Sequence, residues 1–174
     1  ALLLKNANNG AQHRIPISSN FTLFKYFTGT GSVNINEVWY FQKLKFFYNP
    51  VSERVDQVVE NGFNRITTYT SSFSMTTNVY GFFNFKKGKI QTIRQHIQPS
   101  FGFSYTPDFT NESFGYFQNV QTNAEGATRL YNRHQGFIYG GAPQGESRSL
   151  TMSLRSVIEA KIKNNQDSTS EEST

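Results

Sequence analysis

The amino-acid sequence predicts an all-β protein, an antiparallel transmembrane β-barrel that forms a segment of a larger outer-membrane barrel. Long stretches alternate apolar and polar residues, and 16% of the residues are aromatic. Successive side chains of a strand point to opposite faces of its sheet, so each stretch indicates a strand with one apolar and one polar face. A strand that crosses a bilayer needs roughly 9 to 11 residues, about twice the average length in soluble domains. The sequence has no run of about 18 apolar residues, which excludes a transmembrane helix.

Counting these segments gives about six to eight strands, whereas the smallest closed barrels have eight. The strands are expected, in chain order, at 13–19, 22–26, 32–48, 67–85, 91–105, 136–140 and 148–163.

The strand at 148–163 alternates most regularly. Its apolar positions are predicted to face lipid, namely Leu150, Met152, Leu154, Ile158 and Ile162. Its polar positions are predicted to face the interior, namely Thr151, Ser153, Arg155, Glu159 and Lys161.

The upstream strands repeat the pattern. At 91–105, Arg94 and His96 lie on the polar face, where we expect a hydrogen-bonded pair that lines the barrel interior. The predicted luminal wall thus comprises Arg94, His96, Arg155, Glu159 and Lys161. At 67–85 the polar face is almost entirely hydroxyl and amide, and at 32–48 both faces carry apolar residues, so that strand's faces stay undecided.

The connections predict the topology. Residues 86–89 suit a short periplasmic hairpin turn, whereas 49–64 and 106–133 are expected to be long loops, the latter outside the cell. Residues 1–163 form the predicted barrel region, and 164–174 a polar tail rich in Ser, Thr and Glu. Residues 1–10 lack the zones of a signal peptide, and the tail is typical of a loop before a further strand. Both observations favour a portion of a larger barrel.

Charge and composition narrow the function. The net charge of +5 is spread along the chain, which favours contact with anionic lipid headgroups over nucleic-acid binding. His13, His96 and His134 lie far apart and lack metal-ligand spacing, and no catalytic constellation stands out. We therefore expect no enzyme activity, no metal and no cofactor.

The stretch 93–109, IRQHIQPSFGFSYTPDF, resembles a segment of the LptD/OstA-like outer-membrane proteins of Bacteroidota. In the same order, 79–83, 139–146 and 158–163 also resemble that family, so that roughly half of the chain is covered. Gln95 separates Arg94 from His96, which the family has adjacent, and Ala160 stands where Met is common.

The resemblance implies a protein of the Gram-negative cell outer membrane that takes part in the transport of lipopolysaccharide and its insertion there. It implies as partners outer-membrane lipid, lipopolysaccharide, an LptE-like plug lipoprotein and components of a periplasmic bridge. Two alternatives remain open from the residues alone. One is a small eight-stranded or porin-like outer-membrane barrel, and the other is a secreted carbohydrate-binding β-sandwich.

Overall fold

The computed structural model describes residues 9–163, so the predicted polar tail at 164–174 lies outside the described residues. Strands dominate this part of the chain, which confirms the all-β prediction. They are β1 (Gly10–Leu23), β2 (Phe27–Asn49), β3 (Arg54–Thr77), β4 (Val79–Asn84), β5 (Ile90–Thr106), β6 (Phe117–Gln121), β7 (Thr128–Asn132) and β8 (Ser147–Ile162). A single 3-10 turn, η1 (Glu112–Phe114), is the one helical element of residues 9–163, where no helix is long and apolar enough to cross a membrane.

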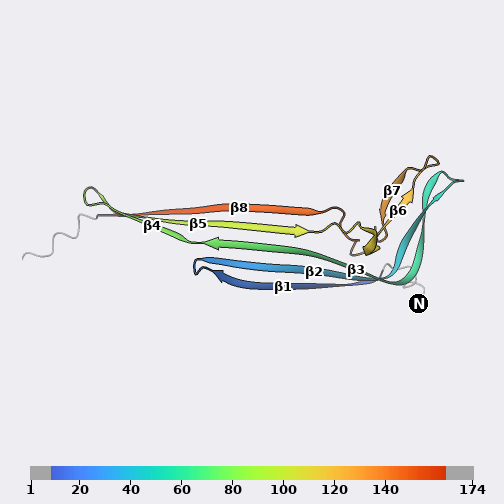
Figure 1. Ribbon diagram of the computed structural model, residues 1–174, viewed down its shortest axis with the longest axis horizontal. Helices are drawn as coiled ribbons and strands as arrows, with labels where there is room; N and C mark the ends of the chain where they lie inside the picture. Colours follow the sequence, from blue (N-terminus) through green and yellow to red (C-terminus); the bar gives the residue numbers. More distant parts are fainter. Residues whose placement is uncertain (1–8, 164–174) are drawn as a thin grey trace, which may run out of the picture. The chain divides into compact units, whose positions relative to one another are not determined.

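Six strands form one sheet in the order β1-β2-β3-β5-β4, with β8 also paired to β5, whereas β6 and β7 form a separate antiparallel pair (Figure 1). β3 and β4 are separated only by Asn78, and both pair with β5. β4 and β5 run antiparallel, from Val79 opposite Ile97 to Asn84 opposite Thr92. Within the described residues β1 and β8 each have one neighbouring strand, so this sheet is open.

The chain divides into two compact units. Among the described residues, unit 1 comprises 9–19, 31–72 and 103–149, and unit 2 comprises 20–30, 73–102 and 150–163. Both units contain parts of the long strands, whereas β4 belongs to unit 2 and the β6–β7 pair to unit 1.

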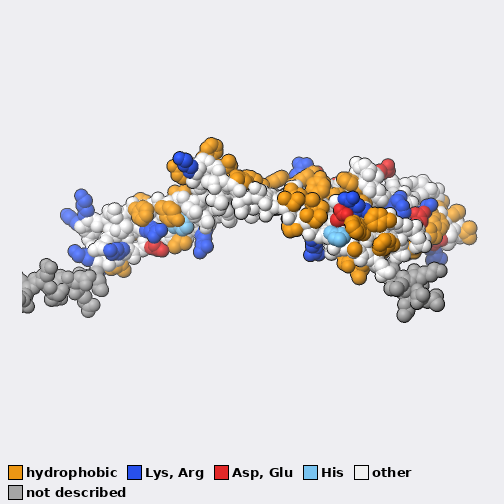
Figure 2. Space-filling view, turned by 90° about the horizontal axis from the view of Figure 1, so that it is seen from below, with side chains coloured by type: hydrophobic (Ala, Val, Ile, Leu, Met, Phe, Trp, Pro, Cys, Tyr) orange, Lys and Arg blue, Asp and Glu red, His pale blue; other side chains and the backbone are white. Residues whose placement is uncertain are grey.

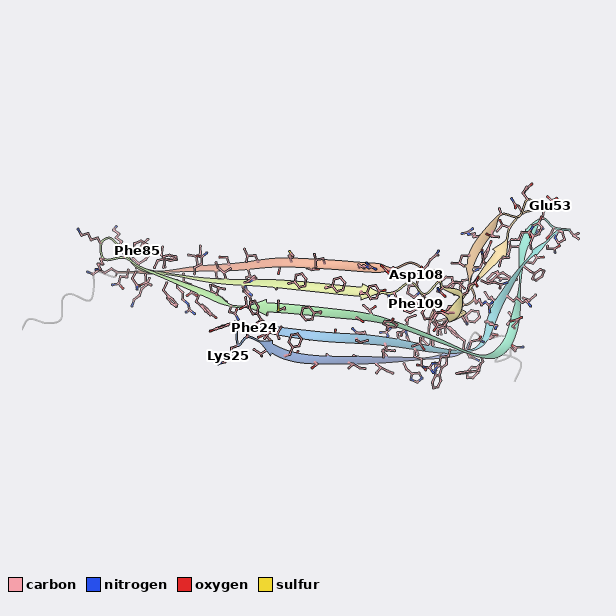
Figure 3. All side chains as sticks on the ribbon, in the orientation of Figure 1. Phe24, Lys25, Glu53, Phe85, Asp108 and Phe109 are labelled. Atoms are coloured by element: carbon pink, nitrogen blue, oxygen red, sulfur yellow. The ribbon has the colours of Figure 1, made fainter. Side chains whose placement is uncertain are left out.

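Two short predicted strands are wrong. At 22–26 β1 ends with Leu23, and Phe24 and Lys25 adopt positive φ angles of 50° and 67° in a tight turn (Figure 3). At 136–140 the chain turns instead, with the Gly140 amide donating to the Phe137 carbonyl at 2.9 Å. Apolar residues gather in both places because they flank turns, and composition alone does not separate a turn from a short strand.

Two predicted loops contain strands. The 49–64 region is mostly the start of β3, and only residues 50–53 connect it to β2. Its polar side chains pair across the two strands, as Asn49 with Asp56 and Lys43 with Glu60. A hairpin with one or both faces in water needs no alternation of apolar and polar residues. The composition of this region is therefore as polar as that of a loop. The 106–133 region holds η1 and the β6–β7 hairpin.

A folded cover lies over one face of β2 in unit 1. We call residues 107–142 the cap segment. Four even-numbered side chains of β2 and Ile66 of β3 are buried with it, and the β2 residues are Val38, Tyr40, Leu44 and Phe46. The buried side chains of the cap segment are Phe109, Tyr116, Phe117, Val120, His134, Phe137 and Ala142. The core of unit 1 is thus built between a sheet face and a chain segment distant in sequence.

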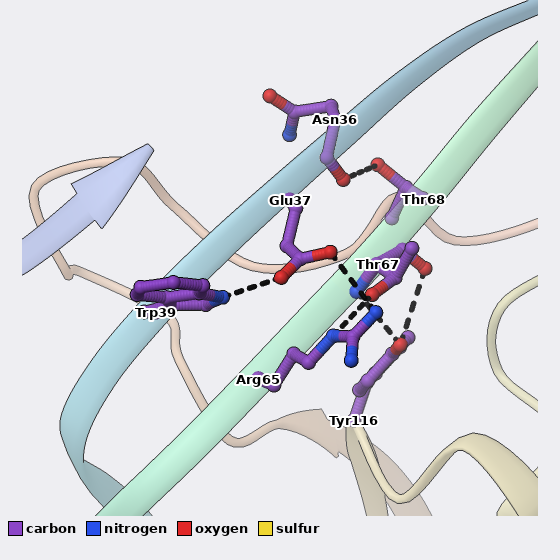
Figure 4. Close-up of polar contacts among 7 residues, drawn as sticks. All are labelled: Asn36, Glu37, Trp39, Arg65, Thr67, Thr68 and Tyr116. Atoms are coloured by element: carbon purple, nitrogen blue, oxygen red, sulfur yellow. Dashed lines mark hydrogen bonds and ion pairs between the residues drawn. The ribbon is translucent and has the colours of Figure 1, made fainter. Parts of the chain in front are cut away.

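The cap segment also binds backbone groups of the two strands. The Leu44 amide donates to the Arg133 carbonyl at 2.8 Å, and the Gln118 side chain bonds both the amide and the carbonyl of Phe46, at 3.2 and 2.8 Å. The Tyr116 hydroxyl accepts from the Thr67 amide at 2.8 Å and lies 3.1 Å from the Thr67 carbonyl, to which it donates (Figure 4). The Tyr116 and Gln118 side chains and the Arg133 carbonyl therefore take the place of a neighbouring strand.

A second polar group of contacts lies beside the Tyr116 bonds. Glu37, on β2, accepts from the Trp39 indole and pairs with Arg65 of β3 at 3.0 Å (Figure 4). The Arg65 Nε donates to the Thr67 hydroxyl at 3.2 Å. The Glu37 side chain is only 13% exposed, whereas the Arg65 side chain is 59% exposed, so the carboxylate is the shielded partner of this pair.

Asp108 and Gly145 tie the beginning of the cap segment to the residues just after its end. The Asp108 carboxylate accepts from the Thr110 amide at 3.0 Å, from the Thr110 hydroxyl at 2.8 Å and from the Gly145 amide at 3.0 Å. The hydrogen bonds from Thr110, and to a smaller extent the one from Gly145, hold the pKa of the Asp108 carboxyl below its usual value.

His134 is buried within the cap core. Its ring stacks on Tyr40 with the centroids 5.2 Å apart and meets Phe137 edge-on at 5.6 Å. Neither ring nitrogen has a hydrogen-bond partner in the described part of the chain. Burial, and then the positive charges of Lys43 and Arg133, lower the pKa of His134 to about 4. The ring is therefore neutral in the folded cap at neutral pH.

Removal of the Tyr116 hydroxyl is expected to loosen the cap. Tyr116→Phe keeps the ring but leaves the Thr67 amide and carbonyl without this partner, which should lower the local free energy of opening by about 1 to 3 kcal/mol. Hydrogen exchange at the Thr67 amide in the full-length protein measures this change. Tyr131→Phe is the control, since Tyr131 stacks its ring on Phe46 at 4.8 Å. Equal exchange in both variants contradicts the role of Tyr116.

The cap should also loosen in acid. Because the folded pKa of His134 lies below the unfolded value of about 6.5, its contribution to stability is complete above that pH and is lost as the pH falls towards 4. The loss reaches about 2 to 3 kcal/mol near pH 4. Hydrogen exchange of cap amides between pH 7 and pH 4, corrected for intrinsic rates, detects it. His134→Phe preserves the aromatic contacts and should flatten this part of the profile; an unchanged profile rules His134 out as the titrating group.

Candidate functional site

The candidate site is the polar face of β4, β5 and β8 in unit 2. Strand pairing places His96 opposite Tyr80 and Arg94 opposite Phe82. Between β5 and β8, the Ser100 and Ser153 hydroxyls lie 2.6 Å apart, and an Arg94 guanidinium nitrogen lies 3.9 Å from a Glu159 carboxylate oxygen. Residues opposite each other on neighbouring strands lie on the same face, so these contacts fix which faces correspond.

All five residues predicted to line the interior share this face. Arg94 and His96 come from β5, whereas Arg155, Glu159 and Lys161 alternate on β8 in step with Ser153. The structure brings Arg94 and Glu159 together, while His96 bonds instead to the Asn78 side chain, with Nε2 and Oδ1 2.9 Å apart. That the face lines a barrel lumen stays a prediction.

Two aromatic rings on this face were not anticipated. Tyr80 stacks on His96 with the centroids 4.5 Å apart and the planes at 10°. The Arg94 guanidinium lies 5.4 Å from the Tyr80 ring centroid and 5.9 Å from that of Phe82. The available signal was their even numbering, which places them on the face of the polar residues Thr76 and Asn78.

Exposure limits what this cluster contributes to stability. The Arg94 and Glu159 side chains are 50% and 65% exposed, and such an ion pair contributes at most about 1 kcal/mol. A cation over an exposed ring contributes about 0.5 to 1 kcal/mol. The cluster therefore holds a positive charge in place on a wet face more than it stabilises the sheet.

The opposite face of β8 carries the predicted lipid-facing residues. Leu150, Met152, Leu154, Ile158 and Ile162 are exposed to between 59% and 72%. Across unit 2 the same kind of exposure is found for Phe83 and Phe85. A continuous row of large apolar side chains needs lipid or a protein partner to cover it, because soluble proteins rarely leave such patches in water. The facing of these residues towards lipid remains a prediction.

Potential metal ligands lie dispersed over the described part of the chain. Among residues 9–163 there is no group of three or more His, Cys, Asp or Glu side chains that could hold a metal ion. His13 contacts Trp39 on unit 1, with ring centroids 4.6 Å apart, whereas His134 lies in the cap core.

Comparison with known proteins identifies a family. A family model described as LptD protein matches residues 1–174, the whole chain. No curated protein and no solved structure matches the chain. The match leaves the expected Bacteroidota source a prediction.

The two faces of β8 should tolerate charge differently. An arginine on a lipid-facing position near the bilayer midplane costs about 2 to 4 kcal/mol, whereas the polar face accepts it at little cost. Leu154→Arg should therefore reduce the folded, heat-modifiable fraction of the full-length protein in outer membranes. Its neighbour Ser153→Arg is the matched control. Equal loss in the two variants contradicts the assignment of the faces.

Proposed function

This chain belongs to the LptD family, whose members act in lipopolysaccharide transport at the outer membrane of Gram-negative bacteria, and on that basis we propose that it forms part of the barrel wall of such a protein. In this proposal the wall takes part in inserting lipopolysaccharide into the outer membrane, and the chain works as scaffold for that movement. No covalent step is assigned to it.

The observation that carries the proposal is the pair of contrasting faces in unit 2. One face of β8 is a row of exposed aliphatic side chains, and the other presents hydroxyl and charged groups shared with β5. A bilayer outside and water inside are the two surroundings that such a sheet needs. A secreted β-sandwich would instead bury the apolar row against a second sheet, and none covers it among the described residues.

The open sheet supports a larger barrel. Within residues 9–163 the outer edges of β1 and β8 have no neighbouring strand. An unpaired backbone group in hydrocarbon costs several kcal/mol, so a membrane sheet must close. We propose that further strands of the barrel pair with β1 and β8. A small eight-stranded barrel made by the described residues does not account for these edges.

The same geometry suggests where partners meet the wall. The polar face around Arg94, His96 and Arg155 is proposed to line a wet interior that holds an LptE-like plug lipoprotein. The short connection between β4 and β5 is proposed to lie in the periplasm, the side from which bridge components deliver lipopolysaccharide.

Depletion followed by rescue tests this function. Cells depleted of the full-length protein should lose lipopolysaccharide from their surface, as measured by surface labelling, and the wild-type gene should restore it. Arg94→Ala, His96→Ala and Arg155→Ala should each restore export while weakening plug retention or barrel stability only modestly, by at most about 1 kcal/mol. Normal surface lipopolysaccharide after depletion excludes the assembly function. If a single-alanine variant loses export while its barrel stays intact, the substituted residue contacts the lipopolysaccharide and does not act only as scaffold.

A further inference from the structure

Positive charge is concentrated in unit 2. Its described residues contain eight Lys or Arg side chains and one acidic side chain, Glu159, which pairs with Arg94. Five of the eight are lysines at the β4–β5 turn and the end of β8, namely Lys86, Lys87, Lys89, Lys161 and Lys163. Figure 2 shows blue side chains gathered at this end of unit 2. The described part of unit 1, in contrast, has basic and acidic side chains in equal numbers, eight of each.

Backbone bonds hold the lysines in one place. The Phe85 amide donates to the Gln91 carbonyl at 2.9 Å and closes the turn, in which Gly88 takes a positive φ of 103° (Figure 3). The Lys163 amide donates to the Lys89 carbonyl at 2.8 Å, which fastens the end of β8 to the turn. All three turn lysines are exposed, and none forms an ion pair with a described residue.

Large exposed rings immediately precede these charges. Phe83 and Phe85, at the end of β4 and directly after it, are 54% and 49% exposed on the proposed lipid-facing side, whereas Tyr80 and Phe82 share the polar face of His96 and Arg94. Rings at the level of lipid headgroups, followed by lysines in the water beyond, are the pattern of a membrane interface. The order of residues from β4 into the turn therefore places the lysines just outside the hydrocarbon.

We infer that this lysine turn is a docking surface for anionic phospholipid headgroups of the leaflet in which the turn lies. The inference rests on the proposed membrane placement of unit 2. A phosphodiester headgroup supplies the negative charge that the described chain does not supply to these lysines, and the Phe83 and Phe85 rings on the proposed lipid-facing side contact the upper part of the acyl chains. Phospholipid fits this surface because apolar rings and then positive charges follow one another along a single hairpin.

Native mass spectrometry of the full-length protein in detergent tests the inference. The probes are short-chain phosphatidylglycerol and phosphatidylcholine of equal chain length, added at matched concentrations. The wild type should bind phosphatidylglycerol more tightly. Each lysine removed should weaken that binding about fivefold, so Lys86→Gln, Lys87→Gln and Lys89→Gln combined should abolish most of the preference. Lys43→Gln with Lys45→Gln is the control, because both lysines lie near Glu60, at 3.7 and 3.4 Å.

The outcomes separate the inference from the proposed function. Equal binding of the two lipids, or an unchanged preference in the triple variant, overturns the lipid surface while leaving the barrel proposal intact. Purified lipopolysaccharide that binds more tightly than phosphatidylglycerol through the same lysines also overturns it, by assigning the turn to the cargo. Wild-type protein that urea extracts from membranes overturns both, since unit 2 then does not lie in a bilayer.

Discussion

Backbone hydrogen bonding is the constraint on which this structure depends. β2 and β3 contain 23 and 24 residues, whereas the strands beside them, β1 and β5, contain 14 and 17. Longer strands beside shorter ones leave amides and carbonyls without a neighbouring strand, and an unpaired edge invites association with other chains. In unit 1 the cap segment answers this need with Tyr116, Gln118 and the Arg133 carbonyl.

The two units also differ in what lies against the faces of their strands. In unit 2 the long strands pair with one another, and one face of the sheet is apolar whereas the other is polar. In unit 1 the even-numbered face of β2 changes character along its length, from the hydroxyl and amide side chains of Ser32 and Asn34 to the buried Val38 and Tyr40. The change begins where the cap segment replaces water as the neighbour of that face.

The sequence predicted the parts of the fold in which solvent dictates the side chain. β5 and β8 were predicted correctly because two different surroundings make apolar and polar side chains alternate along each strand. The shared face of Arg94, Arg155 and Glu159 followed from that alternation. The start of β3 was missed because pairs such as Asn49 with Asp56 satisfy a ladder without any apolar period. The bonds of Tyr116 and Gln118 left no local signal, since their partners lie 49 and 72 residues away. The even numbers of Tyr80 and Phe82 put them on the polar face, and strand pairing then puts them opposite His96 and Arg94.

The cap segment imposes an order in time as well as in space. The Tyr40 hydroxyl donates to the carbonyl of Gly140, 100 residues further along the chain, so this contact closes a loop that contains β3, β4 and β5. Contacts between such distant residues form slowly, because the intervening chain must first be brought together. Until the cap segment packs, the backbone of β2 near Leu44 and Phe46 therefore depends on water for its hydrogen bonds. The free edge of β2 is thus open to pairing with another chain, until the cap segment packs against it.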